Sequence, residues 1–227
     1  MRGRFTLVVL LLLCGELHAS WPGFRGNNAE YRADAPWEVV TGVGLDLRWK
    51  KTIGSGYSQV VVDGSQVFVL FTEDDQDVLA SLDAGSGDEH WRYTLGTAWR
   101  GRQGSLDGPI STPVVDSERL YGLSPYGVLF AVDRSSGKEV WRVDFRESYG
   151  SKLPGYGFAT SPLLHGETVI VQAGGKGGLV GFDRSTGAEK WKTGWKKCGT
   201  RPLPFYLWAS ERNWWPCRGH RFTPLIP

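Results

Sequence analysis

The sequence contains few of the residues that form metal and redox sites. Only three cysteines and four histidines occur among its 227 residues, and residues 20–191 contain no cysteine. No two cysteines form a Cys-x-x-Cys motif, and no histidines have the spacing of metal ligands. These absences exclude the usual zinc and dithiol motifs. They leave Cys198 and Cys217 as a pair that could form a disulfide bond in an oxidising compartment.

Long helix-forming segments are also scarce. After the first fifteen residues, no long run of Ala, Leu, Glu and Lys occurs at helical spacing. The chain has one methionine, but 31 Gly, 11 Trp and 8 Tyr. This composition favours short strands and tight turns over helices, in a chain long enough for one domain with a core.

A basic surface for nucleic acid is missing as well. The net charge is +2, but residues 192–227 carry seven Lys or Arg and one Glu, a net charge of +6. Residues 1–191 therefore carry a net charge of −4, and they show no basic stripe. We therefore expect no nucleic-acid partner.

The N-terminus, MRGRFTLVVLLLLCGELHAS, has the pattern of an export signal. Two arginines precede an apolar segment from Phe5 to Cys14, which is too short for a membrane span. Ala19 offers the small residue of a cleavage site, so residues 1–19 are predicted to be the signal peptide of a periplasmic or secreted protein. Lipid attachment at Cys14 ranks lower, because Leu13 stands where a lipoprotein peptidase needs a small residue.

One motif recurs at a fixed interval along the chain. The sequences LASLDAGSGDEHWRYTL, LFAVDRSSGKEVWRVDF and LVGFDRSTGAEKWKTG begin at residues 79, 129 and 179, and all contain Asp-x-x-x-Gly-x-x-x-Trp. A repeat of this length, with four short strands in each unit, predicts β-propeller blades. The motif residues are Asp83, Gly87, Trp91, Asp133, Gly137, Trp141, Asp183, Gly187 and Trp191.

The second unit shows the expected blade most clearly. Its predicted strands, joined by turns, are residues 113–115, 119–124, 128–133 and 139–145. We predict an all-β fold, a β-propeller of about three to four four-stranded blades in residues 20–194 that form an incomplete ring. Trp49 marks the end of a degenerate earlier unit. A β-sandwich is the less favoured alternative, because it does not require the same turn and Trp at a constant interval.

The recurrence of the motif favours a structural role over a catalytic one. In the turn DRSSGK, the Asp133 carboxylate can accept backbone N–H bonds, and Gly137 can adopt the positive φ that a short hairpin often requires. The Trp141 ring can fill the gap between two wedge-shaped blades, where the small Ala131 leaves room for a neighbour. A catalytic Asp is not expected to recur in the same loop of every blade, so we predict a blade-docking role for all three copies.

These residues resemble a known repeat. AVDRSSGKEVW (131–141) is similar to the tryptophan-docking motif of PQQ-like (pyrroloquinoline-quinone-type) propellers, and WPGFRGNN (21–28) resembles the start of exported bacterial proteins of this type. The resemblance covers residues 20–194 and implies the fold, but it leaves two functions open. One is that of the quinoprotein dehydrogenases, which oxidise alcohols with PQQ and calcium. The other is that of non-catalytic scaffolds, such as the propeller lipoprotein of the outer-membrane assembly machinery.

We favour the scaffold because the hallmarks that the resemblance implies for an enzyme are missing. The dehydrogenases carry two adjacent cysteines against the cofactor, and no such pair occurs in this sequence. The favoured prediction is a non-enzymatic protein, without a catalytic residue, cofactor or metal, that binds a protein partner in the cell envelope. A fragment of a PQQ- and calcium-dependent dehydrogenase is the alternative. A carbohydrate- or polymer-binding propeller is a weaker one.

Two longer segments between blades are candidates for contact with a partner. TAWRGRQGSLDG (97–108) and RESYGSKLPGYGF (146–158) combine aromatic and basic residues. An equally weighted alternative is that the aromatic side chains fill the interfaces between blades. The candidate contact residues are Trp99, Arg100, Arg102, Tyr149 and Tyr156.

Two further stretches have a composition that suggests ligand binding, but their context favours turns. GGKGG (174–178) lacks the Lys-Ser/Thr ending and the helix of a phosphate loop, so we predict a hairpin turn. TEDDQD (72–77) lacks the Gly and the final Glu of a calcium-binding EF-hand loop. We predict a solvated hairpin there, with at most a weak adventitious cation site.

The repeat pattern stops after residue 194. Residues 192–227 contain no Val and no Asp, but four of the eleven Trp and five of the twelve Pro. We favour a shifted reading frame for residues 195–227, because the change falls in the middle of a blade. A genuine basic and aromatic tail that touches a membrane surface is the alternative. An incomplete ring would leave two open blade edges, and self-association through them is expected.

Overall fold

The computed structural model describes residues 20–26, 47–101 and 107–194. The predicted signal peptide (1–19) and the divergent tail (195–227) lie outside these described residues. Almost all regular structure in the described part is β-sheet, arranged as three four-stranded antiparallel sheets with one short helix. The all-β prediction is confirmed.

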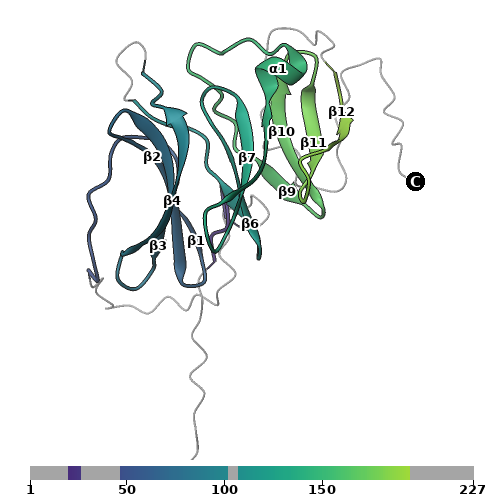
Figure 1. Cartoon of the computed structure of the whole chain (residues 1–227). Coiled ribbons are helices and arrows are strands. Elements are labelled where there is room, and N and C mark those ends of the chain that lie inside the picture. Colours follow the sequence, from purple (N-terminus) through teal and green to yellow (C-terminus); the bar gives the residue numbers. More distant parts are fainter. Residues whose placement is uncertain (1–19, 27–46, 102–106, 195–227) are drawn as a thin grey trace, which may run out of the picture.

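Each sheet is a meander whose four strands follow one another in chain order. The first blade comprises β1 (Val61–Asp63), β2 (Gln66–Glu73), β3 (Gln76–Asp83) and β4 (Glu89–Thr97). The second blade comprises β5 (Val114–Val115), β6 (Arg119–Leu123), β7 (Val128–Asp133) and β8 (Glu139–Asp144). The third blade comprises β9 (Leu163–His165), β10 (Thr168–Gly174), β11 (Gly178–Asp183) and β12 (Glu189–Lys192). The sheets stand side by side in chain order and do not close into a ring (Figure 1).

The middle strands of the blades are buried on both faces, which explains their nearly continuous apolar sequences. In β2, Phe68 and Leu70 face the second blade, whereas Val67 and Val69 belong to a separate cluster on the opposite face. A strand with two covered faces gains stability from apolar residues at every position, so its sequence does not alternate between apolar and polar residues as that of a half-exposed strand does.

We call the face of a blade that points toward the preceding part of the chain its leading face, and the opposite one its trailing face.

A short helix, α1 (Phe145–Tyr149), takes in the predicted last residue of the strand 139–145 and the first four residues of the segment 146–158. The Asp144 carboxylate caps its N-terminus by accepting a bond from the Arg146 N–H, and Gly150 ends it in the left-handed conformation with φ of 61°. Phe145 and Tyr149 are buried between the second and third blades. The predicted strand end at Phe145 and the predicted loop at residues 146–149 are both wrong, because two buried aromatic side chains four positions apart favour a helical turn.

The segment 20–26 joins the inner strands of the first two blades. Trp21 and Val62 of β1 exchange two backbone hydrogen bonds, at 2.6 and 3.2 Å, and Val115 of β5 donates to the Pro22 carbonyl at 2.9 Å. One extended segment therefore fixes the spacing of two blades at their inner edge.

The glycine-rich stretch (174–178) and the acidic stretch (72–77) both form hairpins. Residues 175–177 connect β10 to β11, which confirms the predicted turn. In the acidic hairpin between β2 and β3, Asp77 is only 1 % exposed and accepts bonds from the Thr72 hydroxyl and from the Trp99 N–H at 3.0 Å. Burial raises the pKa of this carboxyl. The prediction of a solvated hairpin is wrong for Asp77, because residues 98–101 fold back over it.

Removing the ring of Phe130 tests the packing between the first two blades. Phe130 is 1 % exposed and packs against Tyr93 of the first blade, with ring centroids 5.1 Å apart. Phe130→Ala should lower the free energy of unfolding by about 3–5 kcal/mol, measured by urea denaturation. Val140→Ala, at a position that is 44 % exposed on β8, serves as the control and should change stability by less than about 0.5 kcal/mol. Equal effects of the two substitutions would contradict this packing.

Candidate functional site

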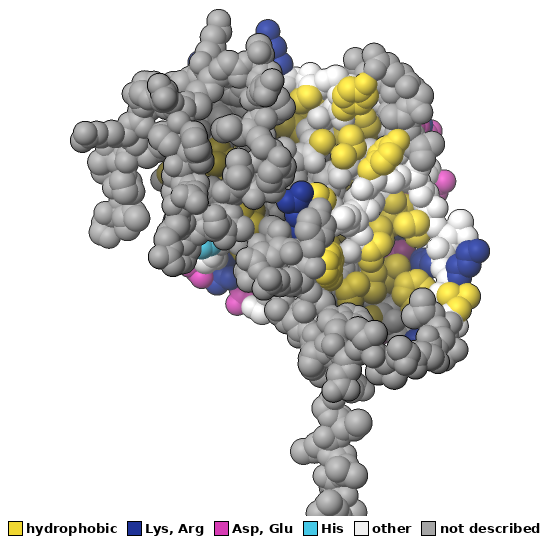
Figure 2. Space-filling view, turned by 180° about the vertical axis from the view of Figure 1, so that it is seen from behind, with side chains coloured by type: hydrophobic (Ala, Val, Ile, Leu, Met, Phe, Trp, Pro, Cys, Tyr) yellow, Lys and Arg dark blue, Asp and Glu magenta, His cyan; other side chains and the backbone are white. Residues whose placement is uncertain are grey.

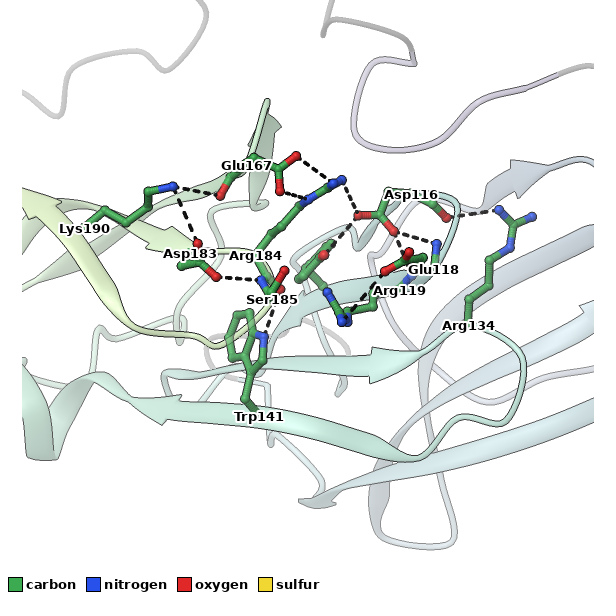
Figure 3. A network of polar contacts seen from close by, with 11 residues as sticks. Asp116, Glu118, Arg119, Arg134, Trp141, Glu167, Asp183, Arg184, Ser185 and Lys190 are labelled. Carbon is green, nitrogen blue, oxygen red and sulfur yellow. Dashed lines mark hydrogen bonds and ion pairs between the residues drawn. The ribbon is translucent and has the colours of Figure 1, made fainter. Parts of the chain in front are cut away.

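The motif Trp of one unit lies on the Asp-x-x-x-Gly turn of the following blade, and we call this contact the docking joint. The indole Nε1 atom donates to the backbone carbonyl of the residue after the motif Asp: Trp49 to Ala84 at 2.9 Å, Trp91 to Arg134 at 2.9 Å and Trp141 to Arg184 at 3.0 Å. The last of these joints is drawn in Figure 3. The turns of all three blades therefore hold a Trp from the preceding part of the chain.

Asp133 fixes the shape of the turn that receives Trp91. Its carboxylate accepts bonds from the hydroxyl groups of Ser135 and Ser136, both at 2.7 Å, and from their backbone N–H groups at 3.1 and 2.8 Å. These bonds favour the ionised form and lower the pKa of Asp133 to about 2. The Asp133 carboxylate is therefore used to hold the turn. Asp83 and Asp183 accept equivalent backbone bonds in the turns of the first and third blades.

The motif glycine is required for two independent reasons. Gly137 has φ of 69°, a conformation that side chains rarely adopt. A Cβ atom at Gly87 or Gly187 would also lie 2.7 Å from the ring of Trp49 or Trp141. Any larger residue would therefore strain the backbone and lift the indole from the turn.

Each motif Trp has a small residue beside it on the third strand of its own blade. Trp91 pairs with Ser81, Trp141 with Ala131 and Trp191 with Gly181, and a β-bulge follows each pair. A side chain at Gly181 would overlap the Trp191 ring. The small residue therefore makes room for the Trp of its own blade rather than for a neighbouring blade.

Arginine side chains form a second contact across the joints, which the sequence analysis missed. Arg134 donates to the Asp63 carboxylate at 2.6 Å and to Gln66 at 2.8 Å, both in the first blade. Arg184 pairs with Asp116 of the second blade at 3.3 Å and with Glu167 of its own blade (Figure 3). The sequence contains a signal for this contact, because an Arg directly follows the motif Asp in the second and third copies of the repeat.

Tyrosine and glutamate form a third contact across the joints. The Tyr149 hydroxyl donates to Glu189 at 2.8 Å, and Tyr93 donates to Glu139 in the same way. Burial and the neighbouring carboxylate raise the pKa of both tyrosines, so both remain donors at neutral pH. Tyr149 is therefore placed in the interface between the second and third blades.

The last motif Trp differs from the others. Trp191 is 38 % exposed, whereas Trp91 and Trp141 are each 9 % exposed. Among the described residues, no acceptor binds the Trp191 indole N–H, and every residue of β12 is exposed. The third blade thus carries a docking Trp without a turn beneath it in the described part of the chain.

The candidate contact residues fall into two groups. Trp99 is 5 % exposed and lies edge-on to Tyr126 with centroids 5.4 Å apart, so its position fits the alternative of interface filling, as that of Tyr149 does. Arg100 and Tyr156 have 59 and 54 % exposure, and Arg100 forms ion pairs with Asp75 and Asp107. Arg102 lies outside the described residues.

The described residues also form a groove and exposed hydrophobic patches. A groove between the first two blades is lined by side chains of both charges, including His90, Arg119 and Asp133. In the ranges that the structure covers, no three His, Cys, Asp or Glu side chains converge into a group that could hold a metal ion. On the reverse face the hydrophobic side chains form separate patches (Figure 2). No helix among the described residues is long and apolar enough to span a membrane.

Comparison with known families identifies the repeat. A family model described as outer membrane protein assembly factor BamB matches residues 74–203, more than half of the chain. The chain belongs to this family. A search of curated proteins finds no match.

Solved structures agree with the fold that the family implies. Quinohemoprotein alcohol dehydrogenase from Comamonas testosteroni is 21 % identical with a TM-score of 0.55, covering 76 % of this chain and 26 % of that one. A second such enzyme, from Pseudomonas putida HK5, is 20 % identical with a TM-score of 0.52 over the same shares. BamB from Moraxella catarrhalis is 22 % identical with a TM-score of 0.38, covering 56 % of this chain and 33 % of that one.

The fold is therefore an incomplete PQQ-like propeller, as the sequence analysis predicts. The chain spans about a quarter to a third of the length of these relatives. At such identities the likeness concerns the fold alone.

Two tryptophans of the same motif provide a matched test of the docking joint. Trp141→Ala removes a buried ring, its hydrogen bond to Arg184 and its contact with Gly187, and should lower the free energy of unfolding by about 3–5 kcal/mol. Trp191→Ala removes an exposed ring and should cost less than about 1 kcal/mol. Urea denaturation followed by circular dichroism measures both. A Trp141→Ala protein as stable as the parent would show that the joint does not hold the blades together.

The pH dependence of Asp133→Asn tests the role of the turn carboxylate. The folded-state pKa lies below the unfolded one, so the charge stabilises the fold fully above about pH 4 and loses this effect as the pH falls toward about 2. The parent should exceed the variant in urea midpoint at pH 6, and the difference should shrink at pH 2.5. A difference that stays constant across this range would assign the loss to geometry rather than charge.

Proposed function

We propose that the chain is a non-catalytic scaffold that binds a protein partner in the cell envelope. The observation that carries this proposal is the match over residues 74–203 to a family described as an outer-membrane assembly factor. The geometry supports it, because the repeated Asp, Gly and Trp residues are used in joints between blades. Export by residues 1–19 remains an expectation from the sequence, as does the shifted frame of residues 195–227.

A fragment of a quinoprotein dehydrogenase is the second candidate. Its support is the likeness in fold to quinohemoprotein alcohol dehydrogenases, which at about 20 % identity is a likeness of fold alone. The sequence has no adjacent cysteines, and the described acidic side chains do not converge on a cation site. The scaffold therefore ranks first, and a polymer-binding propeller ranks behind both.

Two neighbouring loops form the favoured contact surface. The Tyr126 hydroxyl donates to the Ala98 carbonyl at 3.2 Å, and Phe158 donates to the Pro125 carbonyl at 2.8 Å, so both loops pack on the same turn of the second blade. The side chains of Arg100 and Tyr156 are exposed on these anchored loops. A rigid support of this kind lowers the entropy lost on binding, and Arg and Tyr are common in the centres of protein interfaces.

Substitution of these two side chains tests the proposed contact. The parent protein should capture a partner from a bacterial envelope extract. The Arg100→Ala/Tyr156→Ala protein should capture at least tenfold less of that partner, measured by quantitative mass spectrometry. Val140→Ala, on the outer strand β8, is the control and should capture as much as the parent. Equal capture by all three proteins would reject this surface.

A cofactor titration separates the scaffold from the enzyme. The purified protein with added PQQ and calcium should show no saturable binding by calorimetry and no dye-linked oxidation of alcohols. Saturable binding of PQQ, with or without turnover, would favour the dehydrogenase fragment instead.

A further inference from the structure

The residue before the motif Trp is basic in the first and third blades but not in the second. It is the extra residue of a β-bulge, because the residues on either side of it pair with the neighbouring strand and it does not. In the first blade, His90 Nε2 lies 3.8 Å from Asp83 Oδ2. In the third blade, Lys190 Nζ lies 3.6 Å from Asp183 Oδ2 (Figure 3). The second blade has Val140 at this position, which is 44 % exposed.

The Asp133 carboxylate therefore keeps one oxygen atom that its own blade does not use. Its Oδ1 atom accepts all four bonds of the turn, from the hydroxyl and backbone N–H groups of Ser135 and Ser136. Among the described residues, no hydrogen bond or ion pair reaches the Oδ2 atom. The pKa of about 2 keeps this carboxylate charged at neutral pH. The second blade thus carries a negative charge that the equivalent positions of the other two blades place beside a basic side chain.

Asp133 lines a groove at the place where the trailing face of the first blade meets the leading face of the second. The groove has a volume of about 880 Å³ and contains side chains from both blades. Three carboxylates and two guanidinium groups line it, which gives a net charge of −1 with neutral histidine: Asp83, Glu118, Asp133, Arg119 and Arg134. A concave surface with a net negative charge favours a cationic group.

The arginine side chains of the groove are directed to other carboxylates. Arg134 donates to Asp63 at 2.6 Å and to Gln66 at 2.8 Å. Arg119 lies 3.8 Å from Glu118. Neither guanidinium group pairs with Asp133, so its Oδ2 atom is accessible to a base that another molecule supplies.

We propose that this groove binds a lysine or arginine side chain of a protein partner, with the cationic group at Asp133 Oδ2. The partner's side chain would take the place that Lys190 takes beside Asp183 in the third blade. This inference rests on the proposed scaffold function and names the chemistry of a second contact. The groove lies at the opposite end of β3 from Asp75, which pairs with Arg100.

The contribution of this ion pair is one of specificity. A single exposed pair contributes little affinity, but a charge in a groove selects among the segments that enter it. We therefore expect the groove to distinguish a lysine from an uncharged side chain of the same length, rather than to bind any one segment tightly.

A substitution at residue 140 tests the site. Val140→Lys supplies the base that the third blade has, so Asp133 Oδ2 should no longer be open to an external base. Val140→Ala leaves this atom open and is the matched control. The probe is the pentapeptide acetyl-Gly-Val-Lys-Val-Gly-amide, and its control contains norleucine, which keeps the aliphatic chain but lacks the charge. The backbone N–H groups of Ser135 and Ser136 report on binding by NMR, because they donate to the same carboxylate.

The lysine peptide should shift these two N–H resonances in the parent and in Val140→Ala. The norleucine peptide should bind the parent at least about threefold more weakly, and so should the lysine peptide bind Val140→Lys. The response should disappear at about 1 M salt, where charges are screened within about 3 Å. Asp133→Asn, which removes the charge itself, should lose the preference for lysine as well. Circular dichroism verifies that each variant is folded.

Three results would overturn the site. Equal responses to the two peptides would show that charge is not recognised. An unchanged response of Val140→Lys would place the binding elsewhere. Shifts of equal size in the acidic hairpin 72–77 would assign the response to general attraction between opposite charges.

Capture from the envelope extract tests whether a protein partner uses the groove. At least one protein that the parent and Val140→Ala both capture should fall about fivefold or more with Val140→Lys. Equal capture of every protein by the two variants would overturn the partner contact. The peptide titration uses no envelope protein, so its failure would leave the surface of Arg100 and Tyr156 standing. A failure to capture any partner, with an intact peptide response, would instead reject the scaffold function.

Discussion

The structure depends on one constraint: the indole ring of each docked Trp must lie against a glycine of the turn, because any side chain there would displace the ring. The glycine of each turn satisfies it twice, through its positive φ and through the space it leaves for the ring. The motif Asp orders the turn, so that the next carbonyl faces the indole N–H. Because the donor and the turn lie on adjacent blades, each repeat is stabilised mainly by its neighbour, which is how solenoid and propeller arrays gain cooperativity.

Polar side chains add direction to this apolar joint. Arg134 of the second blade pairs with Asp63 of the first, and Tyr93 of the first blade donates to Glu139 of the second, so two separate polar contacts connect these blades. Exposed ion pairs contribute little to stability, but the side chain of Arg134 is only 18 % exposed and forms several bonds at once. The Arg134 guanidinium therefore contributes more to the relative position of the two blades than to the free energy of unfolding.

The strands and turns were predictable because they recur, and a repeat makes every local signal visible three times. The predicted strand 128–133 is identical to β7, and the predicted end of β8 differs by one residue. Contacts between repeats were harder to foresee, since Tyr149 depends on a helix that occurs once and Asp77 on a loop that folds back. For the candidate contact residues, the sequence indicates which loops are long but not which aromatic side chains point inward, as Trp99 and Tyr149 do.

The exposure of Trp191 follows from the same logic that stabilises the other joints. A periodic interface has no intrinsic end, and in the last described unit Trp191 is 38 % exposed although Ile170 on the same face is buried. The first blade avoids this problem with Trp49, which fills its turn without a full blade of the repeat in the described residues. The third blade has no such device there, and β12 carries only its charged residues Glu189, Lys190 and Lys192 as protection against edge pairing. Charged residues oppose non-specific pairing at this strand edge but leave the Trp191 ring exposed.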